Sequence, residues 1–223
     1  MRLRRKALLS GWAVGLLLLP AAFAATKVHV IGFGKWMSVQ TPDAGEAEKM
    51  SAIKIRPLIV DGHVKEYITG AAHEVTDHLF VVRRVFRMND GLPEDAAPRW
   101  QWQIGGWLMV DRVTARVSVV NLPEFDAVSS TASWYRDYVA YCGASDDGKK
   151  SFAIVAQLTR RKPVLRKPLA TSEDGPRCPA PVWQRSPARV SFEPAGGEKT
   201  TFAVRGHVAD VVIADEEEEE GTK

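Results

Sequence analysis

Apolar residues along this chain recur in short runs that polar turn residues separate. In 99–104 they alternate, so that Trp100, Trp102 and Ile104 fall on one face of an extended strand and Arg99 and two glutamines on the other. Two apolar runs, 138–143 and 151–156, flank a polar connection that contains Asp-Asp-Gly, which predicts a hairpin. No segment has a convincing helical period, and 43–50 is expected to form a single helical turn or a loop.

We therefore predict an all-β fold, one domain of antiparallel strands and hairpins over residues 25–214. Strands at this spacing suit a small or irregular β-propeller, a sandwich or a barrel, and the pattern leaves all three open. The predicted strands are Lys27–Phe33, Ile53–Val60, Val64–Ile68, Leu79–Met88, Arg99–Ile104, Trp107–Asp111, Ala115–Leu122, Tyr138–Cys142, Phe152–Leu158, Arg189–Phe192 and Thr201–Val204.

A weak internal repeat follows the tryptophans. Units that begin at Trp102, Trp134 and Trp183 each contain a short gap, an apolar strand, a turn and a second apolar strand, with starts 32 and 49 residues apart. The second unit resembles one blade of β-propellers of the TolB and WD-repeat type. The resemblance covers about 130 residues without an invariant dipeptide signature, and a chain of about 190 residues would hold only four or five blades.

The first 24 residues have the three parts of a signal peptide. Four basic residues precede an apolar run at 7–19, and Ala22-Phe23-Ala24 has the small-x-small pattern of a cleavage site. We expect cleavage after Ala24 and a periplasmic or secreted protein, with Arg4-Arg5 leaving twin-arginine export open beside ordinary secretion. The run is too short to span a membrane, and no later segment is long and apolar enough, so no transmembrane segment is predicted.

The formal charge of +3 divides unevenly along the chain. The leader carries +4, the tail 215–223 carries −5, and the body between them carries +4. The run Glu216–Glu220 predicts a disordered acidic tail. Interspersed charges in the body argue against nucleic acid as a partner. One basic cluster, 160–162 with 166–167, suits either a solvated strand end or contact with an anionic envelope polymer or lipid head groups.

Cys142 and Cys178 are the two cysteines of a chain with an export signal, which predicts a disulfide between them. Closing a loop of about 37 residues would stabilise the fold by about 4 kcal/mol in the chain-entropy model. A catalytic thiol is the alternative, but no neighbouring histidine in the sequence would activate either cysteine.

Motifs for catalysis and metal binding are incomplete. His73 and His78 are weak metal candidates, because a metalloprotease box starting at His73 would need its second histidine where Asp77 stands. The run 143–148 has one residue too many for a hydrolase elbow, and the Ser-x-x-Lys at 51–54 lacks its companion motifs. We predict no metal site and no cofactor. Paired carboxylates, such as Glu124 with Asp126 or Asp137, keep an envelope hydrolase open as the alternative function.

Aromatic residues are concentrated between positions 100 and 141, with arginines among them. Such side chains either pack a small β core or form a surface that stacks on sugars or anchors a protein partner. We predict an exported, non-catalytic binding module of the cell envelope that recognises protein or glycan. The candidate binding residues are Trp102, Trp107, Trp134, Tyr135, Arg136 and Asp137.

Overall fold

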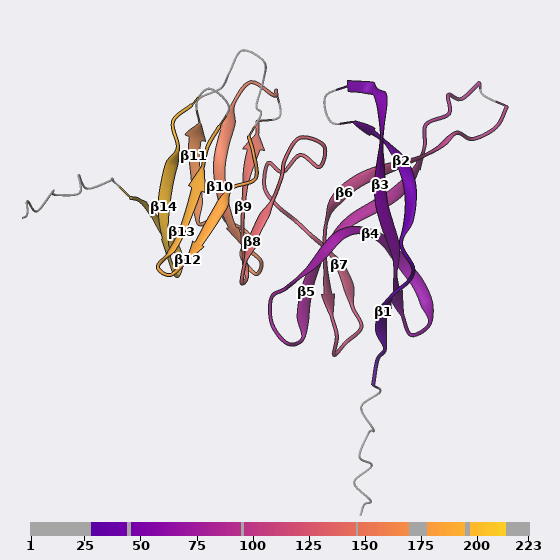
Figure 1. Cartoon of the computed structure of the whole chain (residues 1–223), viewed down its shortest axis with the longest axis horizontal. Coiled ribbons are helices and arrows are strands. Elements are labelled where there is room, and N and C mark those ends of the chain that lie inside the picture. The colour runs from indigo at the N-terminus through magenta and orange to yellow at the C-terminus, as the bar shows by residue number, and fades with distance from the viewer. Residues whose placement is uncertain are drawn as a thin grey trace, which may run out of the picture.

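The computed structural model describes residues 28–43, 46–94, 96–145, 147–169, 178–194 and 197–212 (Figure 1). The predicted signal peptide and the predicted acidic tail lie outside these ranges. The described residues contain no helix, and their strands pair antiparallel in three sheets, so the all-β prediction is confirmed. In this part of the chain no helix has the length and apolar character needed to cross a membrane.

The strands have the following bounds: β1 Ile31–Phe33, β2 Met37–Asp43, β3 Glu46–Val60, β4 His63–Glu74, β5 Leu79–Asn89, β6 Trp100–Asp111, β7 Val117–Val120, β8 Ser133–Tyr135, β9 Tyr138–Ala144, β10 Ser151–Gln157, β11 Leu165–Leu169, β12 Val182–Arg185, β13 Ala188–Phe192, β14 Thr200–Arg205 and β15 Val208–Val211.

Strands β1–β7 form one sheet, which we call the N-lobe. Its order is β1-β3-β4-β5-β6-β7, and β2 pairs with β3 beside β1 (Figure 1). Alternate residues of the central strands give it one fully buried face, as the two-residue period of a strand requires. The members of that core are Leu58, Ile68, Phe80, Val82, Leu108 and Val110.

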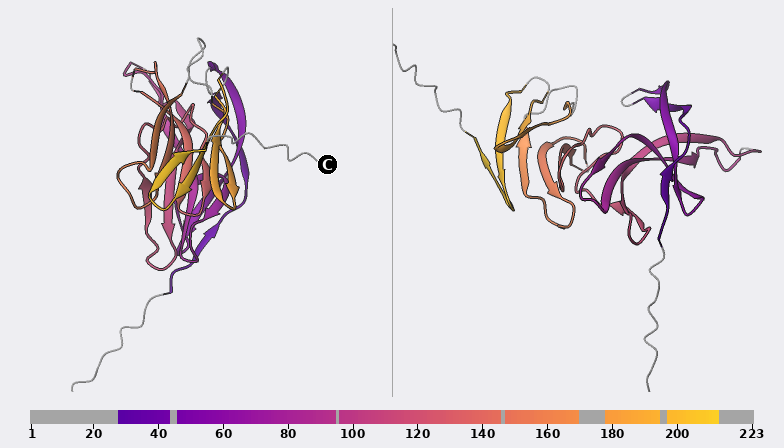
Figure 2. Two further views of the ribbon diagram at one scale, coloured as in Figure 1. Left: turned by 90° about the vertical axis from the view of Figure 1, so that its left-hand side faces the viewer. Right: turned by 60° about the horizontal axis from the view of Figure 1, so that its bottom comes forward.

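Strands β8–β15 form the C-lobe, which lies beside the N-lobe in Figure 1 and in the right-hand view of Figure 2. It consists of two four-stranded meanders, β8–β11 and β12–β15, which pack face to face. Ala140 and Cys142 are the third and fifth residues of β9, and Val190 and Phe192 hold the same places in β13. All four enter the shared core, so the two sheets meet through corresponding faces.

The disulfide between Cys142 and Cys178 is present, as predicted, with 6.0 Å between the two Cα atoms. Cys142 lies in β9, whereas Cys178 lies in the irregular segment that leads into β12. The bond therefore ties the start of the second meander to the middle of the first.

Several predicted boundaries differ from the structure. The predicted strands 99–104 and 107–111 are one strand, β6, whose register shifts opposite Arg83 and Val85. At that shift Gly105 meets the ring of Phe86, which lies 3.2 Å from where a Cβ would be. The helical turn or loop expected at 43–50 is wrong over 46–50, since those residues belong to β3 and pair in part with β2.

The tryptophan repeat corresponds to structure in two of its three units. Trp134 lies in β8 and Trp183 in β12. Each of these short strands is the first of a four-stranded meander, and a two-residue turn connects it to the second strand. Trp102 instead lies inside the long strand β6, so the first unit has a different architecture. The resemblance of the second unit to a propeller blade stays a prediction.

Candidate binding cleft between the lobes

The segment 121–132, which connects β7 to β8, packs against both lobes. Its residues Leu122, Phe125 and Ala132 cover the outer face of the β8–β11 sheet. Tyr141 in β9 stacks edge-on against Phe125 with 5.1 Å between ring centroids, and its hydroxyl donates a hydrogen bond of 2.6 Å to the carbonyl of Pro123. Burial raises the pKa of Tyr141, so the hydroxyl remains a donor at neutral pH.

Arg83 of β5 attaches the same segment to the N-lobe. Its guanidinium lies 5.6 Å from the ring centroid of Trp107 and 4.8 Å from that of Phe125, and it donates a hydrogen bond of 2.6 Å to the carbonyl of Ala127. Burial lowers the pKa of Arg83 to about 10, so the side chain is still protonated at neutral pH. The charge is retained because two aromatic faces and a carbonyl replace part of its water.

Trp134 completes this contact between the lobes. It meets Trp107 edge to face at 5.2 Å and stacks on His73 at 5.8 Å. Nε2 of His73 donates a hydrogen bond of 2.8 Å to the carbonyl of Arg136, which fixes the imidazole over the indole. We call His73, Arg83, Trp107, Phe125 and Trp134 the lobe joint.

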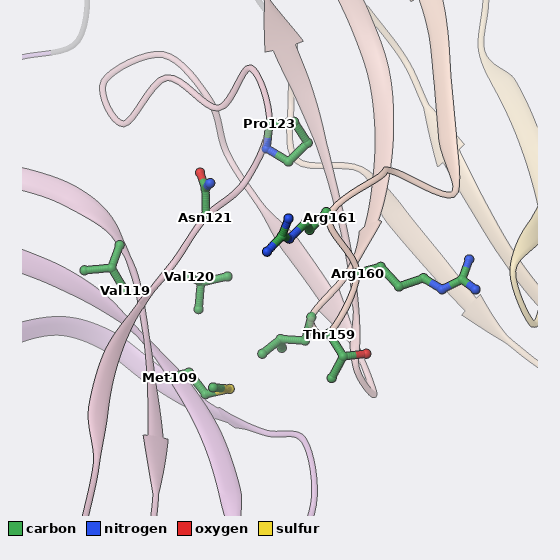
Figure 3. A pocket seen from close by; sticks show the side chains of 9 residues that line it. Met109, Val119, Val120, Asn121, Pro123, Thr159, Arg160 and Arg161 are labelled. Carbon is green, nitrogen blue, oxygen red and sulfur yellow. The ribbon is translucent and has the colours of Figure 1, made fainter.

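A cleft of about 560 Å³ lies between the N-lobe and the turn that follows β10 (Figure 3). One wall is apolar and comes from β6 and β7, whereas the other comes from residues 158–161 and carries two arginines. In Figure 3 the side chain of Arg161 points toward the side of the cleft that Asn121 and Val120 line, whereas that of Arg160 extends away from it. The residues that line the cleft are Met109, Val119, Val120, Asn121, Pro123, Leu158, Thr159, Arg160 and Arg161.

Comparison with known proteins gives no family. No protein-family model matches the chain, and no curated protein matches it.

The predicted binding residues lie in three places. Trp107 and Trp134 belong to the lobe joint, and Trp107 also lines a second hollow of about 350 Å³. Trp102 lies farther along β6, where it packs edge-on against Tyr67 with 5.0 Å between centroids and against the guanidinium of Arg87. Trp102 and Trp107 lie on the same face of β6, and Trp134 contacts Trp107. None of the three lines the larger cleft.

Tyr135 is the last residue of β8, and Arg136 and Asp137 form the turn between β8 and β9. Tyr135 packs on Trp183 at 5.4 Å, and its hydroxyl donates a hydrogen bond of 3.1 Å to the carbonyl of Arg185. Arg136 is exposed and has a positive φ of 54°, while Asp137 accepts a hydrogen bond of 2.7 Å from Gln157. This turn is thus held against the second meander.

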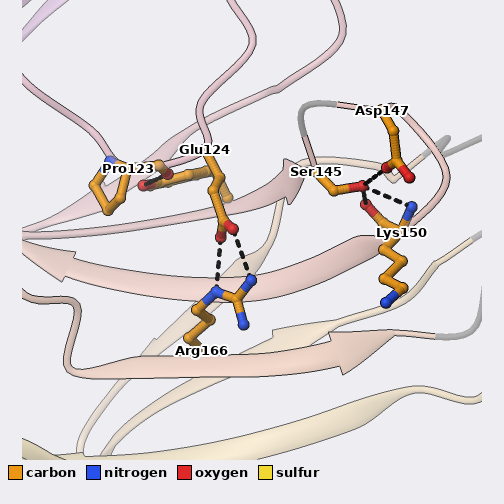
Figure 4. A network of polar contacts seen from close by, with 7 residues as sticks. Pro123, Glu124, Ser145, Asp147, Lys150 and Arg166 are labelled. Carbon is orange, nitrogen blue, oxygen red and sulfur yellow. Dashed lines mark hydrogen bonds and ion pairs between the residues drawn. The ribbon is translucent and has the colours of Figure 1, made fainter.

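The carboxylates considered for hydrolysis have structural partners. Glu124 accepts two hydrogen bonds, of 2.9 and 2.7 Å, from the guanidinium of Arg166 (Figure 4). In the same view the hydroxyl of Ser145 donates to Asp147 and accepts the main-chain N–H of Lys150 at 3.0 Å. The first contact braces the segment 121–132, which we call the linker, and the second closes the predicted hairpin between β9 and β10.

The two weak metal candidates are separate in the structure. His73 is part of the lobe joint, and His78 lies in the exposed turn between β4 and β5. Over the described ranges, no group of three or more His, Cys, Asp and Glu side chains is arranged to hold a metal ion.

Asp126 makes the linker sensitive to acid. Partial burial raises the pKa of its carboxyl, but hydrogen bonds from the Ser129 hydroxyl and from the N–H groups of Val128 and Ser129, with the charge of Arg83, hold it below the ordinary value. A carboxyl whose pKa falls on folding stabilises the native state above its unfolded pKa of about 3.9, and this contribution is lost as pH falls through the folded value.

We expect Asp126→Asn to be less stable than the natural chain at pH 7, and the difference to shrink as pH falls from about 4 to 2, because both forms are then uncharged at this position. Urea unfolding at pH 7 and pH 2.5 measures it. Asp210→Asn, on the exposed strand β15, is the control. A stability difference that stayed constant with pH would contradict the role assigned to the charge.

Sequence reasoning found one wall of the cleft and missed the other. The sequence shows Arg160 and Arg161 as part of a basic cluster, whereas for Val119 and Val120 it predicts only that they lie in a strand. Their meeting depends on how the linker turns between the lobes, which no local pattern encodes.

Proposed function

We propose that this protein is an exported, non-catalytic binding module of the cell envelope, and that it binds a protein or glycan partner in the cleft between its lobes. The observation that carries the proposal is the cleft itself. Its volume of about 560 Å³ lies in the range typical of ligand pockets, and it combines an apolar wall with a few polar groups that can orient a ligand.

Export is supported by two independent features. The first 24 residues have the composition of a signal peptide. The disulfide between Cys142 and Cys178 is of the kind that persists in oxidising compartments such as the periplasm. A disulfide is rare in a reducing cytosol, so both features favour the same location.

The lobe joint gives the cleft a fixed shape. The guanidinium of Arg83 lies 5.6 Å from the ring centroid of Trp107 and 4.8 Å from that of Phe125. Trp134 meets Trp107 at 5.2 Å, and Tyr141 holds the linker from the other side through Phe125 and the carbonyl of Pro123. A site whose walls are already ordered loses less entropy when a partner binds. The aromatic residues therefore support binding here by holding the walls of the cleft in place.

Site-specific photocrosslinking in the native envelope tests the proposal. A benzoylphenylalanine at Asn121, inside the cleft, should give a discrete adduct, whereas the same group at Lys199, exposed beside β14, should not. The purified chain should have the intact mass of a protein that begins at Ala25. Equal crosslinking from both positions, or a full-length cytosolic chain, would contradict the proposal.

A further inference from the structure

Strand β7 is an edge strand without the usual protection. It ends the N-lobe sheet and pairs only with β6 among the described strands, and it consists of Val117-Ser118-Val119-Val120. The free main-chain groups of an edge strand can pair with a strand of another chain. Charged residues or proline in the edge strand normally prevent such pairing. The other edge strands of four or more residues have such protection, from Pro42 and Asp43 in β2, Arg166, Lys167 and Pro168 in β11, Arg185 in β12 and Asp210 in β15.

The pairing shows which groups of β7 are free. Asp111 N–H donates to the carbonyl of Arg116, and the same alternation turns the main-chain groups of Ser118 and Val120 toward β6. The N–H and C=O of Val119 consequently point away from the sheet. The side chain of Val119 is 65% exposed and lines the cleft, so this free edge opens into the cleft.

The wall facing this edge is positively charged. Arg160 and Arg161 line the cleft, Lys162 follows them, and no acidic residue is among the lining residues (Figure 3). Neither guanidinium forms a hydrogen bond or ion pair with another residue that the structure describes. Both remain available for a carboxylate.

We propose that the partner is an extended acidic peptide segment, which adds to β7 as a further antiparallel or parallel strand and places a carboxylate against Arg161. Main-chain hydrogen bonds to Val119 supply affinity, the valines contact alternate side chains of the peptide, and the arginine wall selects negative charge. This inference rests on the proposed binding function and names the partner class for the same cleft.

The probe is a fluorescein-labelled peptide, Gly-Thr-Val-Thr-Val-Glu-Glu, whose binding to the full mature chain is followed by fluorescence anisotropy. We expect Arg161→Glu to weaken binding at least tenfold and Arg205→Glu, at the exposed end of β14, to change it less than twofold. Val119→Pro, which removes the outward N–H, should weaken binding at least tenfold, and Val119→Thr should have little effect. Circular dichroism checks that each variant folds.

Two backbone-methylated probes keep the proposal falsifiable without any protein variant. One carries N-methyl groups on its threonines and the other on its valines. Because alternate N–H groups of an added strand face β7, strand addition predicts that one of the two probes binds and the other does not. Equal binding of both methylated probes would overturn strand addition. If only Arg161→Glu then lost binding, the cleft would select the peptide by its charge alone. No binding of any probe, together with crosslinking from Asn121, would overturn the peptide inference and leave the proposed function standing. A dimer of the chain that Val119→Pro abolishes would also overturn it.

Discussion

Replacement of Trp134 by alanine is expected to lower the free energy of unfolding by about 3 kcal/mol, the low end for a large aromatic residue, because the indole is half-buried. The substitution removes the ring that contacts both His73 and Trp107. Since this ring joins the lobes, limited proteolysis within 121–132 should also become faster. Urea unfolding followed by circular dichroism gives the first quantity.

Trp134→Phe is the matched control. The Nε1 of Trp134 is buried and has no hydrogen-bond partner among the residues that the structure describes, so phenylalanine keeps an aromatic ring in the joint and removes an unsatisfied donor. We expect a loss below about 1.5 kcal/mol. If alanine and phenylalanine were equally tolerated, the indole would not be holding the lobes together.

Removing the disulfide by the double substitution Cys142→Ala and Cys178→Ala should lower the free energy of unfolding by about 4 kcal/mol, because the bond closes a loop with a sequence separation of 36 residues. For a chain of this size such a loss corresponds to a fall in Tm of about 10 °C. Calorimetry on the oxidised and double-variant chains measures it.

Reductant supplies the control for this experiment. Dithiothreitol should lower the Tm of the natural chain toward that of the double variant and leave the variant unchanged. A natural chain whose Tm did not respond to complete reduction would show that the bond adds nothing to the stability of the C-lobe.

Local patterns predicted the strands best where apolar residues form a continuous run between polar turns, as in β9 and β10, which are buried on both faces. The hairpin at 138–157, the strand 79–89 and the disulfide all agree with expectation. Strand β11 escaped prediction because Leu165-Arg-Lys-Pro-Leu169 carries the charges and proline that protect an exposed edge. Strands β8 and β12 are only three and four residues long, too short for a period to show.

The roles of the aromatic residues were beyond sequence reasoning for a different reason. A tryptophan on a strand face has the same sequence signature whether it contacts solvent, a ligand or another lobe. Trp107 and Trp134 meet only because the linker between them folds back across β5, where Arg83 donates a hydrogen bond to a main-chain carbonyl of the linker. Such a contact depends on the path of the chain in space and not on the spacing of residues.

The burial of β10 has a consequence for the chain before it folds. Six consecutive residues, Ser151–Ala156, are buried in the native C-lobe. The same uncharged, proline-free stretch of strand-forming residues is prone to intermolecular aggregation while the chain is still unfolded. Lys149 and Lys150 precede it and Arg160 and Arg161 follow it, as gatekeeper charges do around such segments. The arginines of the cleft thus also help to keep the newly made chain soluble until β9 and β11 have enclosed this strand.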